Sequence, residues 1–185
     1  IFMPVFGLNN GVVPIVAYNY GAQNRLRMVE TIKRSTIYAS CIMVLGVIIF
    51  WAIPGPLLKI FDATDTMLQV GVPALRIISL SFCMAGACIA LGSSFQALGK
   101  AVYSMTTSII RQLVFLVPIA YVLARYGHSI GNDDLVWWSY PLAEIASLLV
   151  TLVFFRRLYR TLIAPLPASG GAPVHDDSDD DPIGE

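Results

Sequence analysis

The chain has 185 residues, of which 56% are hydrophobic and only 13% are charged, about half the charged share of a soluble domain. One soluble core of this size could not bury so much apolar surface, so composition excludes a single soluble domain and indicates a membrane protein. The net charge of +0 hides a surplus of positive charge outside the last ten residues, which hold six of the twelve acidic side chains. The positive residues flank apolar segments and form no single face, which argues against a nucleic-acid partner.

Residues 1–20 are apolar but interrupted by proline, glycine and asparagine, with Pro14 inside the run. The chain opens in the middle of this run without an initiator methionine or a charged leader, so we expect a fragment that begins within a partial span. Two interpretations remain open, a bent helix beside a cavity and a merely irregular helix end. Residues 21–35 are polar, and an apolar side chain recurs every three positions, which predicts a short surface helix.

Four complete membrane spans are predicted after this point, each long enough to cross or nearly cross the hydrocarbon core. They are residues 36–53, 74–98, 102–124 and 136–155. In the connector after the first of them we expect Asp62 to cap the next helix. Residues 125–135 are expected to form a polar loop that contains His128. Residues 164–185 lack enough apolar side chains to order themselves, which predicts a disordered acidic tail after a membrane domain of residues 1–163.

The second and third complete spans form a hairpin that turns tightly at Gly99 and Lys100. Small residues recur every four positions in the first arm, at Gly86, Ala90 and Ser94. Such a stripe lets a neighbouring helix approach closely in lipid, and we favour packing over a cavity wall for it. The three cysteines lie in apolar runs without metal-ligand spacing, so we interpret them as small apolar fillers and predict no metal site.

The positive charges predict how the spans are oriented. Eight of the twelve lysines and arginines fall on one side of the predicted spans, and only Lys59 and Arg125 fall on the other. The richer side is expected to be cytoplasmic. This places the C-terminal tail in the cytoplasm and the chain in the cell membrane as a multi-pass protein, with the lipid bilayer as its partner.

Three ionisable residues lie within the spans, at Arg76, Arg111 and Glu144. Arg76 is near a span end, where its long stem can reach the headgroups. At helical rise, Arg111 lies roughly 13 Å from one interface and Glu144 about 12 Å from the other, hence at similar depth in a core ~30 Å thick. We therefore predict an ion pair or a shared polar cavity. A static link between helices and a role in a substrate or ion pathway both remain open.

Weaker candidates share the property of being polar or helix-bending at membrane depth. The polar ones are Gln96, Asn10 and Asn19, and the candidates for kinks or hinges are Pro14, Pro118 and Pro141. No nucleophile motif, phosphate loop, metal-ligand set or paired intramembrane carboxylates is visible, so no catalytic residue is predicted and the chain is not expected to be an enzyme.

Several motifs resemble one transporter family. PIVAYNYGAQN followed by a basic segment resembles the end of the second helix of a lobe in the MATE (multidrug and toxic compound extrusion) family. FQALGK, SIIRQLVFLVPIAYVL and WSYPLAEIAS resemble the last three helices of the same lobe. The similarity covers about residues 1–163 and is most specific where FQALGK and IIRQLVFLVP occur together.

The resemblance implies an all-α membrane bundle, one incomplete lobe of a two-lobed transporter with twelve helices. It implies secondary active efflux of amphipathic, mostly cationic drugs or metabolites by alternating access, coupled to Na⁺ or H⁺, with the missing N-terminal lobe as intramolecular partner. Residues 74–98 lack the carboxylate that some relatives use for the coupling ion, so the ion site is expected in the missing lobe. Glu144 stands at the P-x-A-[DE] position of the last helix, and Arg111 at an R-Q position. No other cofactor is expected.

Two other functions compete with efflux. A lipid-linked sugar flippase of the same superfamily would favour a more cationic cavity, for which one buried Arg111 is modest support. A membrane scaffold without cargo is the alternative from a different class. The fragment alone is not expected to transport, because half of any central cavity would be missing.

Overall fold

The computed structural model describes residues 1–168, which are mainly helical and contain no strand. There are eight α-helices, two π-helical segments and one 3₁₀ segment: η1 lies between α6 and α7, η2 precedes α8 and η3 follows α8. Their bounds are α1 Phe2–Gly21, α2 Arg25–Ala52, α3 Pro54–Lys59, α4 Asp65–Ser79, α5 Phe82–Ala97, α6 Ala101–Ile109, η1 Ile110–Leu116, α7 Val117–Ile130, η2 Asp133–Trp138, α8 Ser139–Leu158 and η3 Tyr159–Ile163.

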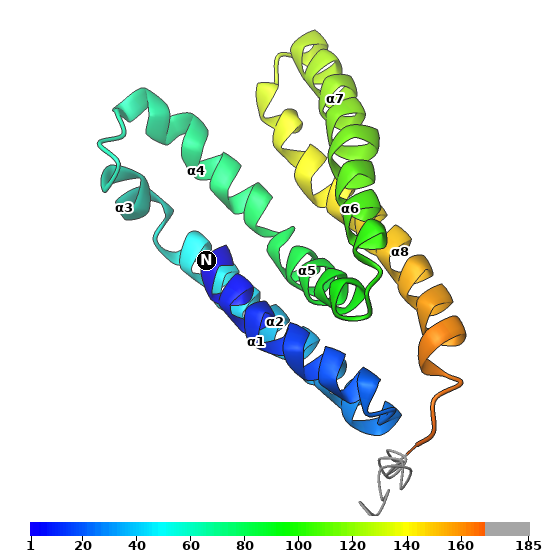
Figure 1. Ribbon diagram of the computed structural model, residues 1–185. Helices are drawn as coiled ribbons and strands as arrows, with labels where there is room; N and C mark the ends of the chain where they lie inside the picture. The colour runs from blue at the N-terminus through cyan, green and yellow to red at the C-terminus, as the bar shows by residue number, and fades with distance from the viewer. Residues whose placement is uncertain (169–185) are drawn as a thin grey trace, which may run out of the picture.

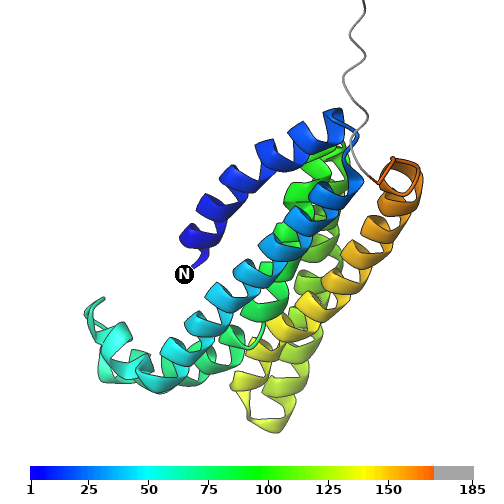
Figure 2. The same ribbon diagram turned by 90° about the horizontal axis from the view of Figure 1, so that it is seen from below.

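Helix α5 is the centre of the bundle. Helices α1 and α2 pack on one side of it, and α6 and α8 on the other (Figures 1 and 2). Two clusters of buried apolar side chains hold these helices together. One surrounds Phe95, Met28 and Ile163 near the α5–α6 corner, and the second surrounds Met43 and Phe82 further along α2 and α5.

Three membrane spans can be recognised by length and composition in the described residues, or four if one bent pair of helices counts as a span. The helices Arg25–Ala52, Ala101–Ile130 and Asp134–Ile163 each meet this test alone. Helices α4 and α5 are bent by 49° relative to each other and meet it only together, which fits a broken span or a re-entrant loop. Helix α1 is not among them, although it is continuous through Pro14, because its asparagines lower its apolar character.

The expected surface helix at residues 21–35 is wrong as a separate element. Helix α2 begins at Arg25 and continues unbroken to Ala52, so these residues are its first turns. The Asn24 side chain caps the helix by accepting a hydrogen bond from the Arg27 N–H at 3.1 Å. No proline follows within α2 to interrupt it, so the polar segment and the apolar span form one helix.

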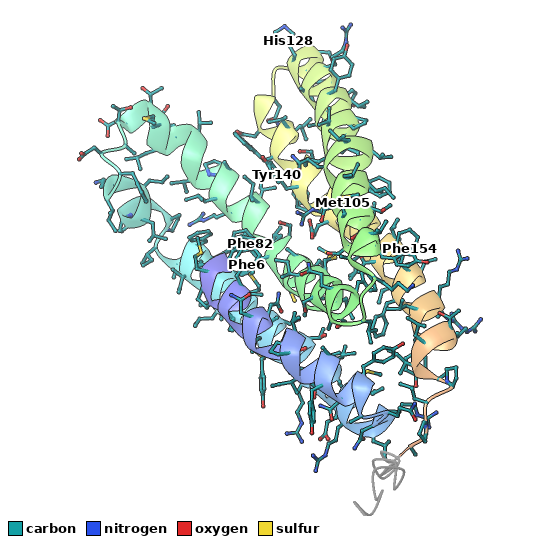
Figure 3. The ribbon with its side chains drawn as sticks, viewed as in Figure 1. Phe6, Phe82, Met105, His128, Tyr140 and Phe154 are labelled. Atoms are coloured by element: carbon teal, nitrogen blue, oxygen red, sulfur yellow. The ribbon has the colours of Figure 1, made fainter. Side chains whose placement is uncertain are left out.

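Two other local expectations are also wrong. Thr64, not Asp62, caps α4, and its side chain accepts from the Met67 N–H at 3.4 Å. Asp62 lies in the turn before it with a φ of +55°. His128 belongs to the last turn of α7 instead of a loop and lies near the tip of that helix (Figure 3). The helix ends only at Gly131, whose φ of +68° favours glycine.

The hairpin corner and the small-residue stripe are confirmed. Gly99 has a φ of +69°, and the Lys100 N–H donates to the Phe95 carbonyl at 2.8 Å, which closes the turn between α5 and α6. Gly86, Ala90 and Ser94 are all buried. At Gly86 the backbone of α2 comes so close that an added Cβ would lie 3.1 Å from the Ala39 carbonyl oxygen. The stripe therefore serves helix packing.

The first residues after η3 are hydrogen-bonded to the start of α2. The Arg25 guanidinium donates to the Ala164 carbonyl at 3.0 Å, and the Arg25 N–H donates to the Pro167 carbonyl at 3.3 Å. The segment thus accepts N–H groups that the start of α2 would leave unpaired. The remainder of the predicted acidic tail, residues 169–185, lies outside the described residues.

Candidate functional site

A polar cavity lies between α1, α5, α6, η1 and α8, with a volume of about 340 Å³. Its walls combine amides, hydroxyls and a few apolar side chains. They are Phe2, Phe6, Asn9, Asn10, Val13, Cys88, Ile89, Gly92, Ser93, Gln96, Ser104, Thr107, Ser108, Arg111, Ser147 and Thr151. Among the described residues, Arg111 is the only charged side chain in this wall.

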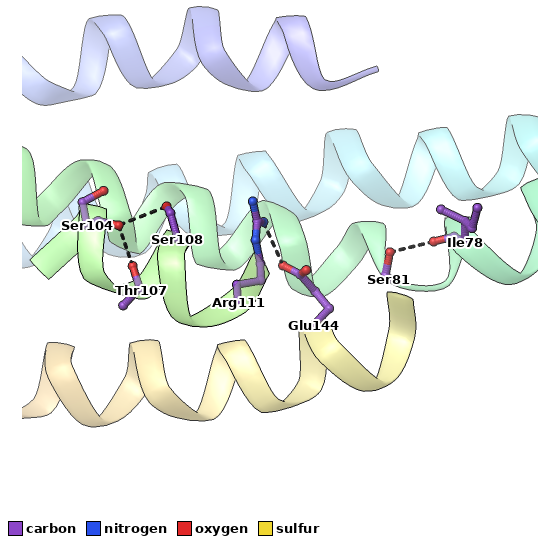
Figure 4. A network of polar contacts seen from close by, with 7 residues as sticks. All are labelled: Ile78, Ser81, Ser104, Thr107, Ser108, Arg111 and Glu144. Carbon is purple, nitrogen blue, oxygen red and sulfur yellow. Dashed lines mark hydrogen bonds and ion pairs between the residues drawn. The ribbon is translucent and has the colours of Figure 1, made fainter. Parts of the chain in front are cut away.

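The α6–η1 wall of the cavity follows helical spacing. Ser104, Thr107, Ser108 and Arg111 are three or four positions apart and so share one face. The Thr107 and Ser108 hydroxyls donate to the Ser104 carbonyl at 2.9 and 3.0 Å, which satisfies their protons within the helix (Figure 4). Their lone pairs remain available to a solute or to water.

Arg111 lies in the π-helical segment η1. Its wider turn is visible in the Val117 N–H, which donates to the carbonyl of Gln112, five residues earlier. Pro118 follows directly and has no N–H to continue the regular α-helical pattern. Short π-helical segments often occur at functional sites, and Arg111 is the second residue of this one.

Arg111 and Glu144 form the predicted ion pair, with Nη1 and Oε1 3.5 Å apart (Figure 4). The Glu144 side chain on α8 is only 9% exposed, whereas that of Arg111 is 35% exposed. Glu144 Oε1 has no hydrogen-bond partner among the described residues, so the pair is held by charge at a longer distance than a hydrogen bond prefers. The pairing is confirmed; the role of the pair stays a prediction.

Glu144 faces a second cavity, of about 250 Å³, between α1, α4, α5, η1 and α8. Ser81, Phe82 and Tyr140 also line it, and Tyr140 lies at the start of α8 beside the space toward α4 (Figure 3). Arg111 lines both cavities and therefore lies between them. Its carboxylate partner is absent from the wall of the first cavity.

The structure brings two of the three weaker polar candidates to the first cavity. Asn10 and Gln96 line it, and the Gln96 amide donates to the Ser104 hydroxyl at 3.2 Å. Asn19 does not belong to the cavity wall. It is buried near the end of α1, and its amide donates to the carbonyl of Ile15, one turn earlier, at 2.8 Å.

The three predicted hinge prolines have different environments. Pro14 is exposed within the continuous helix α1, Pro118 is exposed after η1, and Pro141 is buried in the first turn of α8. Their role as hinges stays a prediction.

Sequence reasoning missed the polar residues that are buried in the cavity walls. Asn9 and Ser93 are in contact across α1 and α5, with the Ser93 hydroxyl 3.4 Å from Asn9 Oδ1. Ser147 and Thr151 continue the face of Glu144 along α8 and are 3% and 2% exposed. The available signal was their helical spacing from Glu144 on a face otherwise made of small residues.

The first two thirds of the chain match a known protein family. The MatE family model matches residues 1–122, so the chain belongs to the MatE family and is part of a multi-pass membrane protein. Members of this family are transporters and not enzymes, in agreement with the sequence expectation.

Relatives and solved structures agree with this assignment. The chain is 25% identical over 158 residues to the multidrug export protein MepA of Staphylococcus aureus, covering 83% of this chain and 34% of MepA. It is 22% identical over 125 residues to the probable multidrug resistance protein NorM of Thermotoga maritima, covering 68% of this chain and 27% of NorM.

Among solved structures, the MATE multidrug transporter DinF-BH is 33% identical, with a TM-score of 0.73 over 86% of this chain and 34% of that one. An inward-facing multidrug resistance MATE transporter of the MOP superfamily shares the fold, with 18% identity and a TM-score of 0.80 over 87% of this chain and 37% of that one. The chain thus spans about one third of the length of the proteins it matches.

Proposed function

We propose that the whole protein to which this chain belongs is a secondary active multidrug exporter. Its cargo would be amphipathic, mostly cationic drugs or metabolites, exchanged for Na⁺ or H⁺ across the cell membrane. The observation that carries the proposal is that a MatE-family chain, related to proteins named as multidrug exporters, has a partly open cavity of mixed polar and apolar lining between its helices.

The composition of the cavity supports broad cargo recognition. Phe2, Phe6 and Ile89 supply apolar surface beside hydrogen-bonding amides and hydroxyls. Apolar walls with few polar anchors can accept solutes of varied shape, because little depends on one fixed contact. The polar groups orient the cargo, and the rest of the protein completes the cavity.

Coupling requires that the ion favour one of two conformations, since a ligand shifts an equilibrium only by its differential affinity for the two states. No acidic side chain occurs between residues 74 and 98. We therefore propose that the coupling ion binds in the other lobe. The π-helical segment η1 before Pro118 is a candidate for the bending that alternation requires.

The experiment uses the full-length protein in sealed vesicles with a fluorescent cationic dye. Dye movement is expected only when a Na⁺ or H⁺ gradient is imposed, and an ionophore that collapses the gradient should abolish it. Vesicles without protein are the control. Translocation of a lipid-linked sugar in place of the dye would favour a flippase, and movement of neither cargo would favour a scaffold.

A further inference from the structure

Arg111 has more hydrogen-bonding capacity than its neighbours use. A guanidinium carries five N–H donors in a planar fork. Within the described residues its ionic partner is Glu144 at 3.5 Å, and Glu144 Oε1 accepts no hydrogen bond. The Arg111 side chain is nevertheless 35% exposed at a depth where the helix crosses the membrane. Its free donors therefore face a wet cavity or a ligand.

The charge in the first cavity has one sign. Arg111 supplies the only charge of the wall among the described residues, while the Glu144 carboxylate faces the second cavity. Glu144 at 3.5 Å offsets much of the long-range field of Arg111, so the attraction for an anion comes from short charge-assisted hydrogen bonds to the donors that face the first cavity. A planar oxyanion that accepts two parallel hydrogen bonds matches the fork of Arg111 best.

We propose that this cavity is a carboxylate subsite, in which Arg111 binds the carboxylate of an amphoteric solute. Phe6 and Val13 in the same wall would contact the apolar body of that solute. Glu144 is a positioning residue, because it contacts the guanidinium from the side of the second cavity and leaves the donors on the first side free. The proposal rests on the proposed function, since it adds carboxylate-bearing solutes to the cargo.

A purely structural ion pair predicts a different outcome from a subsite. In a structural pair, loss of either partner has the same consequence for binding, because each breaks the same link. In a subsite the two losses act in opposite directions. Arg111→Gln removes the group that binds the solute's carboxylate. Glu144→Gln removes a competing carboxylate and leaves the cavity more positive.

The experiment measures binding of two rhodamine dyes to the purified full-length protein by fluorescence anisotropy. One dye carries a free carboxyl group, and the other carries the ethyl ester of that group. The ratio of the two affinities, acid to ester, is compared between variants, so that partition of the dyes into detergent cancels. Arg111→Gln is expected to lower this ratio about tenfold or more, as charge-assisted hydrogen bonds are lost. Arg111→Lys should lower it less, since charge remains without the fork. Glu144→Gln should maintain or raise it.

Arg76→Gln is the matched control, because it removes an exposed arginine of α4 that lies outside both cavities. The proposal is overturned if Arg111→Gln leaves the ratio unchanged, if Glu144→Gln lowers it as much, or if Arg76→Gln has the same effect. Elution as a single symmetric species by gel filtration establishes that each variant is folded. A protein that exports neither dye contradicts the proposed function, whereas the binding ratio still decides on the subsite.

Discussion

Glu144 and Arg111 are buried to different extents, and this decides what each substitution leaves behind. The Glu144 side chain is 9% exposed, and its Oε1 atom has no hydrogen-bond partner among the described residues. The Arg111 side chain, in contrast, lines a cavity. Removal of Arg111 leaves a buried carboxylate without its counter-charge. Removal of Glu144 leaves a guanidinium that can still reach water.

We therefore expect Arg111→Gln to destabilise the full-length protein more than Glu144→Gln does. The loss for Arg111→Gln should be about 2 kcal/mol, below the range for a fully buried pair because Arg111 is partly exposed. Thermal unfolding in detergent measures both. The double variant should recover part of the loss, because it removes both charges. Equal losses for the two single variants would contradict this account.

At the scale of elements, the contact of α2 with α5 depends on the absence of a side chain at Gly86. An added Cβ there would lie 2.8 Å from Met43 Cγ and 3.1 Å from the Ala39 carbonyl oxygen. Met43 is fully buried, so neither helix can yield without disturbing the cluster around it. Small residues thus let the two helices approach closely where lipid offers no hydrophobic force between them.

Gly86→Leu is expected to destabilise the protein by about 1–3 kcal/mol, the usual cost of inserting atoms into a packed interface. The matched control is Gly11→Leu in α1, where an added Cβ meets nothing within 4 Å. Unfolding midpoints of the full-length variants in one detergent give the comparison. A control that loses as much as Gly86→Leu would show that the helix backbone, not the interface, is responsible.

At the scale of the whole molecule, positive charge gathers at one end of the bundle. The α1–α2 turn, the end of α8 and the first residues after η3 meet there, as the hydrogen bonds of Arg25 to Ala164 and Pro167 show (Figure 1). Lys59 and Arg125 belong to the segments at the other end. By the positive-inside rule we predict a cytoplasmic location for the first end.

Labelling of introduced cysteines tests this orientation. In a full-length variant without Cys41, Cys83 and Cys88, a membrane-impermeant thiol reagent should label Lys59→Cys in intact cells. Lys100→Cys, at the exposed α5–α6 corner, should be labelled only after the cells are permeabilised. The reverse pattern would place the positive end outside and refute the orientation.

The sequence by itself determined the membrane class, the turn at Gly99 and the common depth of Arg111 and Glu144. These properties depend on composition, on one residue's backbone freedom and on a constant rise per residue. All three can be read along the sequence without knowledge of tertiary contacts. Sequence also favoured packing for the stripe at Gly86, because small residues at helical spacing let a neighbouring helix approach closely in lipid.

The tertiary structure alone decided which polar residues meet. Asn9, Ser93 and Thr151 come from three helices, and they share a cavity only because of how each helix is rotated about its axis. Asn19 is as polar as Asn10 but lies outside that cavity, and Arg111 faces the first cavity while Glu144 faces the second. Helix rotation follows from long-range side-chain packing, which periodicity in one segment does not specify.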